Sequence, residues 1–101
     1  MNIRRFRFVS DPGHGYLRVP LTVLKEYGVE FKISPFSFKS DKFAYLEEDV
    51  DMATFIEAVR SAGDDVEYKV SYVNNPASCR NFPRFPETMG YINFRKEKYG
   101  F

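Results

Sequence analysis

The distribution of hydrophobic and polar residues predicts strands along most of the chain. Residues 3–9 place Phe6 and Phe8 on one side and arginines on the other, which is the two-residue period of a half-buried strand. The same period predicts further strands at residues 16–19, 36–38, 43–45 and 66–72, of which the middle two form a hairpin. The pattern therefore indicates about five strands.

Two other segments follow the period of a helix. The clearer one, residues 52–62, repeats hydrophobic residues at i, i+3, i+4 and i+7, and Asp49 or Asp51 is expected to cap its N-terminus. A shorter helix begins at Pro20, which fits the first helical position. We expect Gly28 to end it in a left-handed conformation.

The C-terminal part of the chain loses this regularity. Residues 74–86 contain three prolines and two consecutive asparagines, which predicts a long loop. Residues 89–95 are expected to form a last edge strand, and residues 96–101 a basic, aromatic tail. We therefore divide the chain into a scaffold, residues 3–73, and a loop with a C-terminal extension, residues 74–101.

Together these elements predict the α+β fold class, with a small antiparallel sheet of about five strands and two helices packed on one face. Hairpins between successive strands favour antiparallel pairing, and the helices should cover one face of the sheet. The length of 101 residues allows a single domain, 1–101. The chain is 44% hydrophobic, with eleven Phe and no Trp, which is enough for one core without disulfides or a metal.

Cysteine content and hydropathy indicate the compartment. The single cysteine, Cys79, cannot form a disulfide within the chain, which is typical of a reducing compartment. No hydrophobic stretch has the length of a signal peptide's core or of a membrane span. We therefore expect a cytoplasmic protein with no membrane partner.

Charge is unevenly distributed along the chain, although the net charge is only +1. Residues 1–46 carry +4, residues 47–67 carry −7 and residues 68–101 carry +4. If the acidic segment lies on one side, the domain has a charge dipole that could orient a partner. The simpler interpretation is a solvated helix face with its N-terminal turn.

The turn Asp11-Pro12-Gly13-His14-Gly15 is the most individual feature of the sequence, because it displays the only histidine between glycines. Asp11, His14 and Arg18 are candidates for binding or hydrolysing a nucleotide or another small ligand. A plain tight turn with a solvated histidine is the favoured alternative, since no nucleophile can be named. One His and one Cys do not make a transition-metal site, so neither a metal nor another cofactor is expected.

Two interaction surfaces can also be proposed. Arg4, Arg5 and Arg7 on the first strand, with the basic and aromatic residues of the C-terminal part, favour nucleic-acid binding. The alternative is that Phe82 and Phe85 only hold the loop against the core. A protein partner is favoured over nucleic acid, since Tyr, Phe and Arg are enriched at interface centres, and a structural tail that closes the sheet is the alternative. The candidate contacts are Arg80, Phe82, Arg84, Phe85 and Tyr99, with Glu47, Glu48 and Asp49 as a second surface.

The turn at residues 11–15 followed by Arg18-Val19-Pro20, and then Ala44-Tyr45-Leu46-Glu47-Glu48-Asp49 before a Phe-containing helix, resemble motifs of small uncharacterised proteins of tailed bacteriophages and bacterial mobile elements. The resemblance covers roughly residues 6–60 and transfers no activity. It implies an accessory protein of the bacterial host cytoplasm, where such proteins block host defence or redirect host machinery. The sequence therefore favours stoichiometric binding to a host or phage protein over catalysis, with nucleic-acid and small-ligand binding as alternatives.

Overall fold

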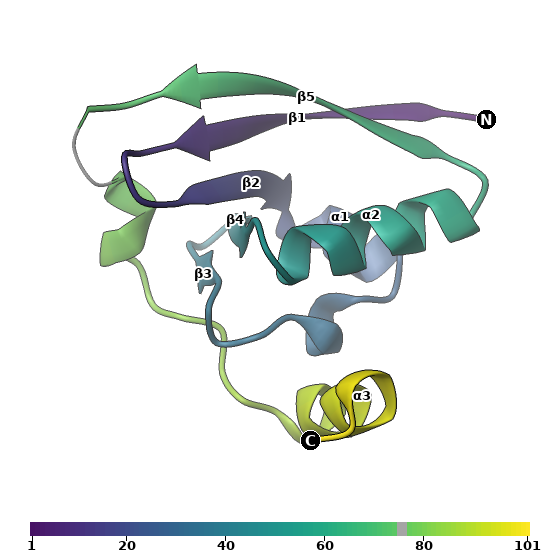
Figure 1. Ribbon diagram of the computed structural model, residues 1–101. Helices are drawn as coiled ribbons and strands as arrows, with labels where there is room; N and C mark the ends of the chain where they lie inside the picture. The colour runs from purple at the N-terminus through teal and green to yellow at the C-terminus, as the bar shows by residue number, and fades with distance from the viewer. Residues whose placement is uncertain (75–76) are drawn as a thin grey trace.

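A five-stranded sheet forms the centre of the computed structural model, which describes residues 1–74 and 77–101 (Figure 1). The strands lie in the order β3-β4-β2-β1-β5. Their bounds are β1 (Ile3–Ser10), β2 (Gly15–Pro20), β3 (Phe38–Lys39), β4 (Phe43–Glu47) and β5 (Asp65–Tyr72). The predicted α+β class and the order of elements up to β5 are confirmed.

The sheet is mixed. β1 pairs with β2, β2 with β4, and β3 with β4 in the antiparallel orientation expected from the hairpins. β5 pairs in parallel with β1 over all eight of its residues. The reason is the connection: β4 runs parallel to β1, and a helix then carries the chain past β2 and β1 to the far edge, as parallel crossovers require.

Two helices, α1 (Leu21–Glu26) and α2 (Asp51–Ser61), lie on the same side of the sheet (Figure 1). The main core forms between them and the sheet, around fully buried residues such as Leu17, Leu46 and Phe55. Both helices end at a glycine with positive φ, 68° at Gly28 and 88° at Gly63. After α1 the backbone N–H of Val29 donates to the Leu24 carbonyl at 3.1 Å and that of Gly28 to the Lys25 carbonyl at 3.0 Å, which is the Schellman pattern.

The opposite face of the sheet carries a second, smaller core. Beyond β5 the chain forms a short 3-10 helix, η2 (Ser78–Asn81), and Ala77 and Cys79 pack there against Tyr16 and Phe38. The chain then runs beside β3, where Lys39 donates to the Pro83 carbonyl at 2.9 Å. Residues 77–85 therefore cover this outer face around Tyr16, Phe38 and Tyr45.

The strand predicted at residues 89–95 is wrong, because this segment lies in the helix α3 (Met89–Tyr99), which also takes up most of the expected tail. The Thr88 hydroxyl accepts a hydrogen bond from the backbone N–H of Tyr91 at 3.1 Å and caps the helix. Gly100, with φ of 81°, ends it. α3 packs on a second 3-10 helix, η1 (Glu30–Lys32).

The capping of α2 also differs from the prediction. Val50 occupies the N-cap position, and the Glu47 carboxylate accepts hydrogen bonds from the backbone N–H groups of Asp49, Val50 and Asp51. The Asp51 side chain instead lies buried and accepts hydrogen bonds from two serines, Ser34 and Ser37. One carboxylate therefore stabilises the helix end while the other fixes the loop before β3.

Candidate functional site

Asp11 joins the β1–β2 turn to the C-terminal part of the chain. Its Oδ1 accepts hydrogen bonds from the backbone N–H groups of Gly13 and His14 at 2.9 and 2.7 Å. Its Oδ2 accepts from the N–H of Ala77 at 2.8 Å and from the Arg80 guanidinium at 3.4 Å. The hydrogen bond from Ala77, with those of the turn, lowers the pKa of this buried carboxyl to about 2. Its oxygens are thus engaged within the molecule.

The two glycines of this turn do not adopt a positive φ. Among the residues described, positive φ occurs only at Gly28, Gly63 and Gly100. The Asp11 carboxylate closes the turn instead, and Gly15 is needed for space. A Cβ there would lie 2.2 Å from the Phe8 ring.

The three ligand-binding candidates are not brought together. His14 is exposed beside a depression of about 310 Å³ that Glu47, Arg80 and Arg84 also line. Arg18 lies on β2 and places its guanidinium carbon 4.6 Å from the centre of the Phe43 ring. The small-ligand site built on Asp11, His14 and Arg18 therefore stays a prediction that the geometry does not favour.

Most candidate contacts of the C-terminal part have partners within the chain. Phe85 is buried in the main core. Arg84 lies 4.6 Å from the Phe38 ring and donates to the Pro35 carbonyl at 3.1 Å. Phe82 packs against Tyr45, with 5.6 Å between ring centres, and 36% of it is exposed. These residues hold residues 77–85 on the sheet.

The remaining sequence candidates lie at separate places on the surface. Glu48 and Asp49 are exposed between β4 and α2, whereas Glu47 caps the helix. Tyr99, 43% exposed, lies at the end of α3 with its ring 6.4 Å from that of Phe94. Glu47 and Asp49 line the same depression as Arg80 and Arg84, whereas Tyr99 does not line it.

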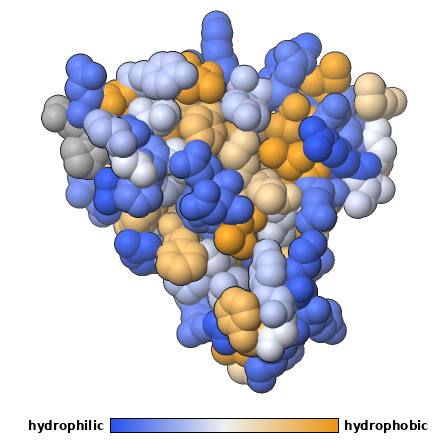
Figure 2. Space-filling view, viewed as in Figure 1, coloured by the Kyte–Doolittle hydropathy of each residue, from blue (hydrophilic) through white to orange (hydrophobic). Residues whose placement is uncertain are grey.

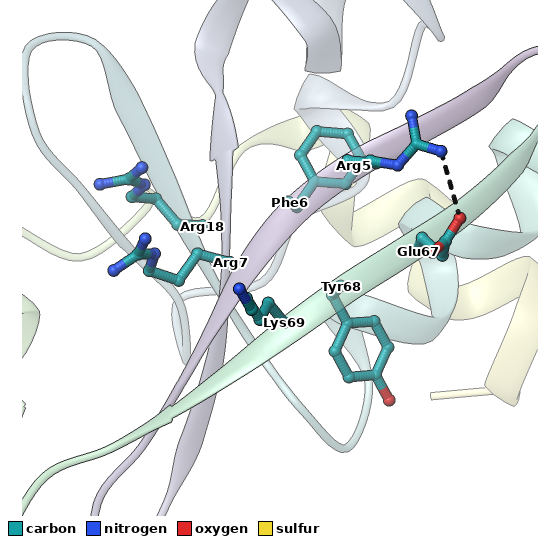
Figure 3. Close-up of a pocket in the computed structure, with 7 residues that line it drawn as sticks. All are labelled: Arg5, Phe6, Arg7, Arg18, Glu67, Tyr68 and Lys69. Carbon is teal, nitrogen blue, oxygen red and sulfur yellow. Dashed lines mark ion pairs between the residues drawn. The ribbon is translucent and has the colours of Figure 1, made fainter.

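The pairing of three strands creates a group of cations that the sequence did not reveal. Arg18 of β2 lies opposite Arg7 of β1, and Arg7 lies opposite Lys69 of β5. We call Arg18, Arg7 and Lys69 the basic row. Figure 3 shows Arg7 and Arg18 extending toward the same side from neighbouring strands. This side is the outer face of the sheet, away from α1 and α2, where residues 77–85 leave β1 and β5 uncovered.

The basic row has no acidic partner among residues 1–74 and 77–101. The ion pair beside it joins Arg5 to Glu67 at 3.7 Å (Figure 3). Like charges directly opposite each other on neighbouring strands destabilise a sheet. A depression of about 490 Å³ lies at this position and is lined by the row together with Arg5 and Glu67. The arrangement is therefore suited to an anion supplied from outside.

Alternation alone placed Arg5 and Arg7 on one face of β1. The positions of Arg18 and Lys69 beside Arg7 depend on how the strands pair. The sequence makes Arg18 a candidate only as part of the turn site, and it does not make Lys69 a candidate for any site. The missing information was the parallel pairing of β5 with β1. A local pattern does not specify which distant strands become neighbours.

The part of the chain that the structure describes shows neither a metal-binding cluster nor a membrane-spanning helix. It contains no group of three or more His, Cys, Asp or Glu residues placed to hold a metal ion. None of its helices has the length and hydrophobicity needed to cross a membrane.

Comparisons with protein-family models, curated proteins and solved structures find no match to this chain. The resemblance to phage proteins therefore stays a prediction, and functional proposals rest on the geometry of the molecule.

Proposed function

We propose that this protein acts by non-catalytic binding and that its outer sheet face binds single-stranded nucleic acid. The observation that carries the proposal is the basic row, three cations in register without acidic partners among the residues described. Neighbouring strands lie about 4.8 Å apart, so the row concentrates three positive charges within about 10 Å. A phosphate backbone would relieve their mutual repulsion.

Arginine favours phosphate as the partner of this row. The planar guanidinium matches phosphate oxygens with two parallel hydrogen bonds, so Arg7 and Arg18 suit this anion better than a point charge would. Arg5 lies on the same face of β1 and is 73% exposed along its side chain. It adds a fourth cation whose ion pair with Glu67 is weak, since both groups face solvent.

Aromatic rings continue the row and favour an unpaired strand over a duplex. Tyr45 of β4 lies opposite Arg18, and Phe82 packs against Tyr45. Phe43 lies beneath the Arg18 guanidinium. Phosphate-binding cations beside aromatic side chains are typical of surfaces on which unpaired bases stack.

Binding to a host or phage protein stays a prediction. Of the residues named for it, Phe85 is buried and Arg80 and Arg84 have intramolecular partners, which weakens that interpretation. The two kinds of partner differ in salt dependence, because phosphate contacts release condensed counterions.

The proposal is tested by fluorescence anisotropy with labelled single-stranded and duplex DNA and RNA of mixed sequence. We expect affinity for single strands to fall steeply with salt, by about 0.7 in logarithmic slope for each phosphate contact. Arg7→Gln should lower that slope by about 0.7, the share of one phosphate contact, and should weaken binding of every sequence. Lys96→Gln, which removes an exposed cation from α3, is the matched control and should bind as wild type does.

Stability provides the second measurement. Arg7→Gln removes the central charge of the row, so its free energy of unfolding should equal or exceed that of the wild type. Lower affinity with undiminished stability would separate a binding role from a structural one. Binding that is undetectable, insensitive to salt, or equal in wild type and Arg7→Gln would overturn the proposal.

A further inference from the structure

β5 is an edge strand whose outward backbone groups can be assigned. The N–H groups of Asp65 and Val73 both point to β1, where they donate to Asn2 and Ser10 at 2.9 Å. Because alternate residues of a strand share a side, the N–H and C=O groups of Val66, Tyr68 and Val70 face the open edge. Within residues 1–74 and 77–101, no strand pairs with this edge. A long free edge is a template for another strand.

Hydrophobic side chains accompany these outward backbone groups. Tyr68, Val70 and Tyr72 are 47%, 39% and 82% exposed, although they share a face with the buried Phe8. In the view of Figure 2, hydrophobic residues reach the surface at several places, including the upper part of the molecule where β5 lies. The edge therefore offers both hydrogen-bonding groups and apolar surface.

The sequence of β5 is complementary to itself. When two copies of Val66-Glu67-Tyr68-Lys69-Val70 run antiparallel with Tyr68 opposite Tyr68, Glu67 of each copy lies opposite Lys69 of the other. Val66 likewise lies opposite Val70 on both sides of the centre. Opposite charges and β-branched pairs at such positions stabilise a sheet.

Other registers lack this complementarity. A shift of one residue between the two β5 strands would move side chains to the opposite face, so the nearest alternative registers are shifted by two residues. A shift in one direction places Lys69 opposite Lys69, and a shift in the other places Glu67 opposite Glu67. The charges therefore favour one register over its nearest competitors.

We propose that a second copy of this chain pairs with the first along β5, antiparallel and about a two-fold axis at Tyr68, to form a continuous ten-stranded sheet. The N–H of Tyr68 donates to the Tyr68 carbonyl of the other copy, and the N–H of Val70 donates to the Val66 carbonyl. The N–H of Val66 keeps its bond to the Asp65 carboxylate at 2.8 Å. Such an interface is self-complementary, as two-fold dimers require.

This inference does not rest on nucleic-acid binding, although the two are compatible. The two-fold axis is perpendicular to the sheet, so the outer faces of both copies form one surface. The basic rows of the two copies then lie on that shared surface. The tests below contain no nucleic acid, so a failed dimer and a failed nucleic-acid proposal are distinguished.

Sedimentation equilibrium over a range of concentrations tests the dimer. The wild type should shift from 11.8 kDa toward twice that mass as concentration rises. Glu67→Lys and Lys69→Glu each turn two attractive cross-strand pairs into repulsive ones, so either variant alone should dimerise about 30-fold more weakly. An equimolar mixture of the two should recover dimerisation, because every pair is attractive in the mixed dimer.

Proline at position 70 tests the backbone part of the interface. Val70→Pro removes an outward N–H that β1 does not use, and an edge strand accepts proline there. The variant should keep its circular-dichroism spectrum and lose the dimer. If it unfolds, the charge-exchange mixture decides the question.

Three results overturn the proposal. One is a wild type that stays monomeric at every soluble concentration, which would leave the edge to a strand of another protein. Another is a folded Val70→Pro variant that dimerises as the wild type does. The third is a mixture of the two charge variants that dimerises no better than either alone.

Discussion

Replacing Asp11 by asparagine tests whether one buried carboxylate holds residues 77–85 on the sheet. The asparagine oxygen can still accept from Gly13 and His14 and close the turn. Its amide group, however, would face the N–H of Ala77 and the Arg80 guanidinium, which are themselves donors. The variant therefore keeps the local turn and removes the long-range attachment.

The expected loss of stability follows from the carboxyl's pKa. That pKa falls from its ordinary 3.8 to about 2, led by the hydrogen bond from Ala77. A fall of this size corresponds to about 2 kcal/mol in favour of the folded state near neutral pH. A buried N–H without an acceptor costs about 1–3 kcal/mol, which overlaps with this figure rather than adding to it. We expect Asp11→Asn to be about 2 kcal/mol less stable.

The dependence on pH identifies the cause. Because folding lowers the pKa of Asp11, its contribution is complete above the unfolded value of 3.8 and disappears as pH falls through about 2. Urea unfolding at several pH values measures the difference in free energy of unfolding between the wild type and Asp11→Asn. This difference should be constant above about pH 5 and should narrow below about pH 4. Other carboxyls titrate in both proteins and cancel in the difference.

The only cysteine supplies a local measurement. Cys79 belongs to the same segment and is buried against the sheet. Burial raises the pKa of its thiol to about 11, so it reacts only when the segment opens. A thiol reagent should modify the variant about 30-fold faster than the wild type. Asp41→Asn alters an exposed carboxylate in the β3–β4 turn and should change neither measurement. A stability difference under about 0.5 kcal/mol, or one independent of pH, would refute the reasoning.

Two further substitutions test other contacts by urea unfolding. Gly15→Ala places a methyl group against the buried Phe8 ring and should cost about 1–3 kcal/mol, whereas Gly13→Ala meets its nearest atom at 3.9 Å and should be nearly neutral. Equal stability of the two variants would contradict this. Burial raises the pKa of Asp51, so the stability of the wild type falls as pH rises through the raised pKa of this carboxyl. Asp51→Asn, which cannot ionise, should gain stability relative to the wild type from acidic to neutral pH, and the opposite trend would exclude burial as the main cause.

Local patterns were sufficient where local interactions decide the structure. The alternation around Phe6 and Phe8 predicted β1, and Gly28 ends α1 as expected. α3 was missed although signals for it were present. Thr88 caps it, and Gly100 follows the basic residues of its last turn. Its hydrophobic residues do not form a helical stripe, because the short element η1 provides its main contact.

The site depended on contacts between distant parts of the chain. The turn chemistry of Asp11 was predictable from Gly13 and His14, two and three residues away. Its second oxygen meets Ala77, 66 residues away, and no local signal indicates that contact. The same applies to Lys69, which joins Arg7 only through the parallel pairing of β5.

Residues 77–85 decide which part of the outer face is available to a partner. They close the outer face around Tyr16 and Phe38 and use Arg80 and Arg84 for attachment. The β1-β5 half stays open because the segment turns away beside β3. Arg7, Lys69 and the free edge lie on that half, and Arg18 lies beside it on β2. Of the residues that suggested a contact surface, Arg80, Arg84 and Phe85 act as attachment, and the proposed binding surface lies beside them.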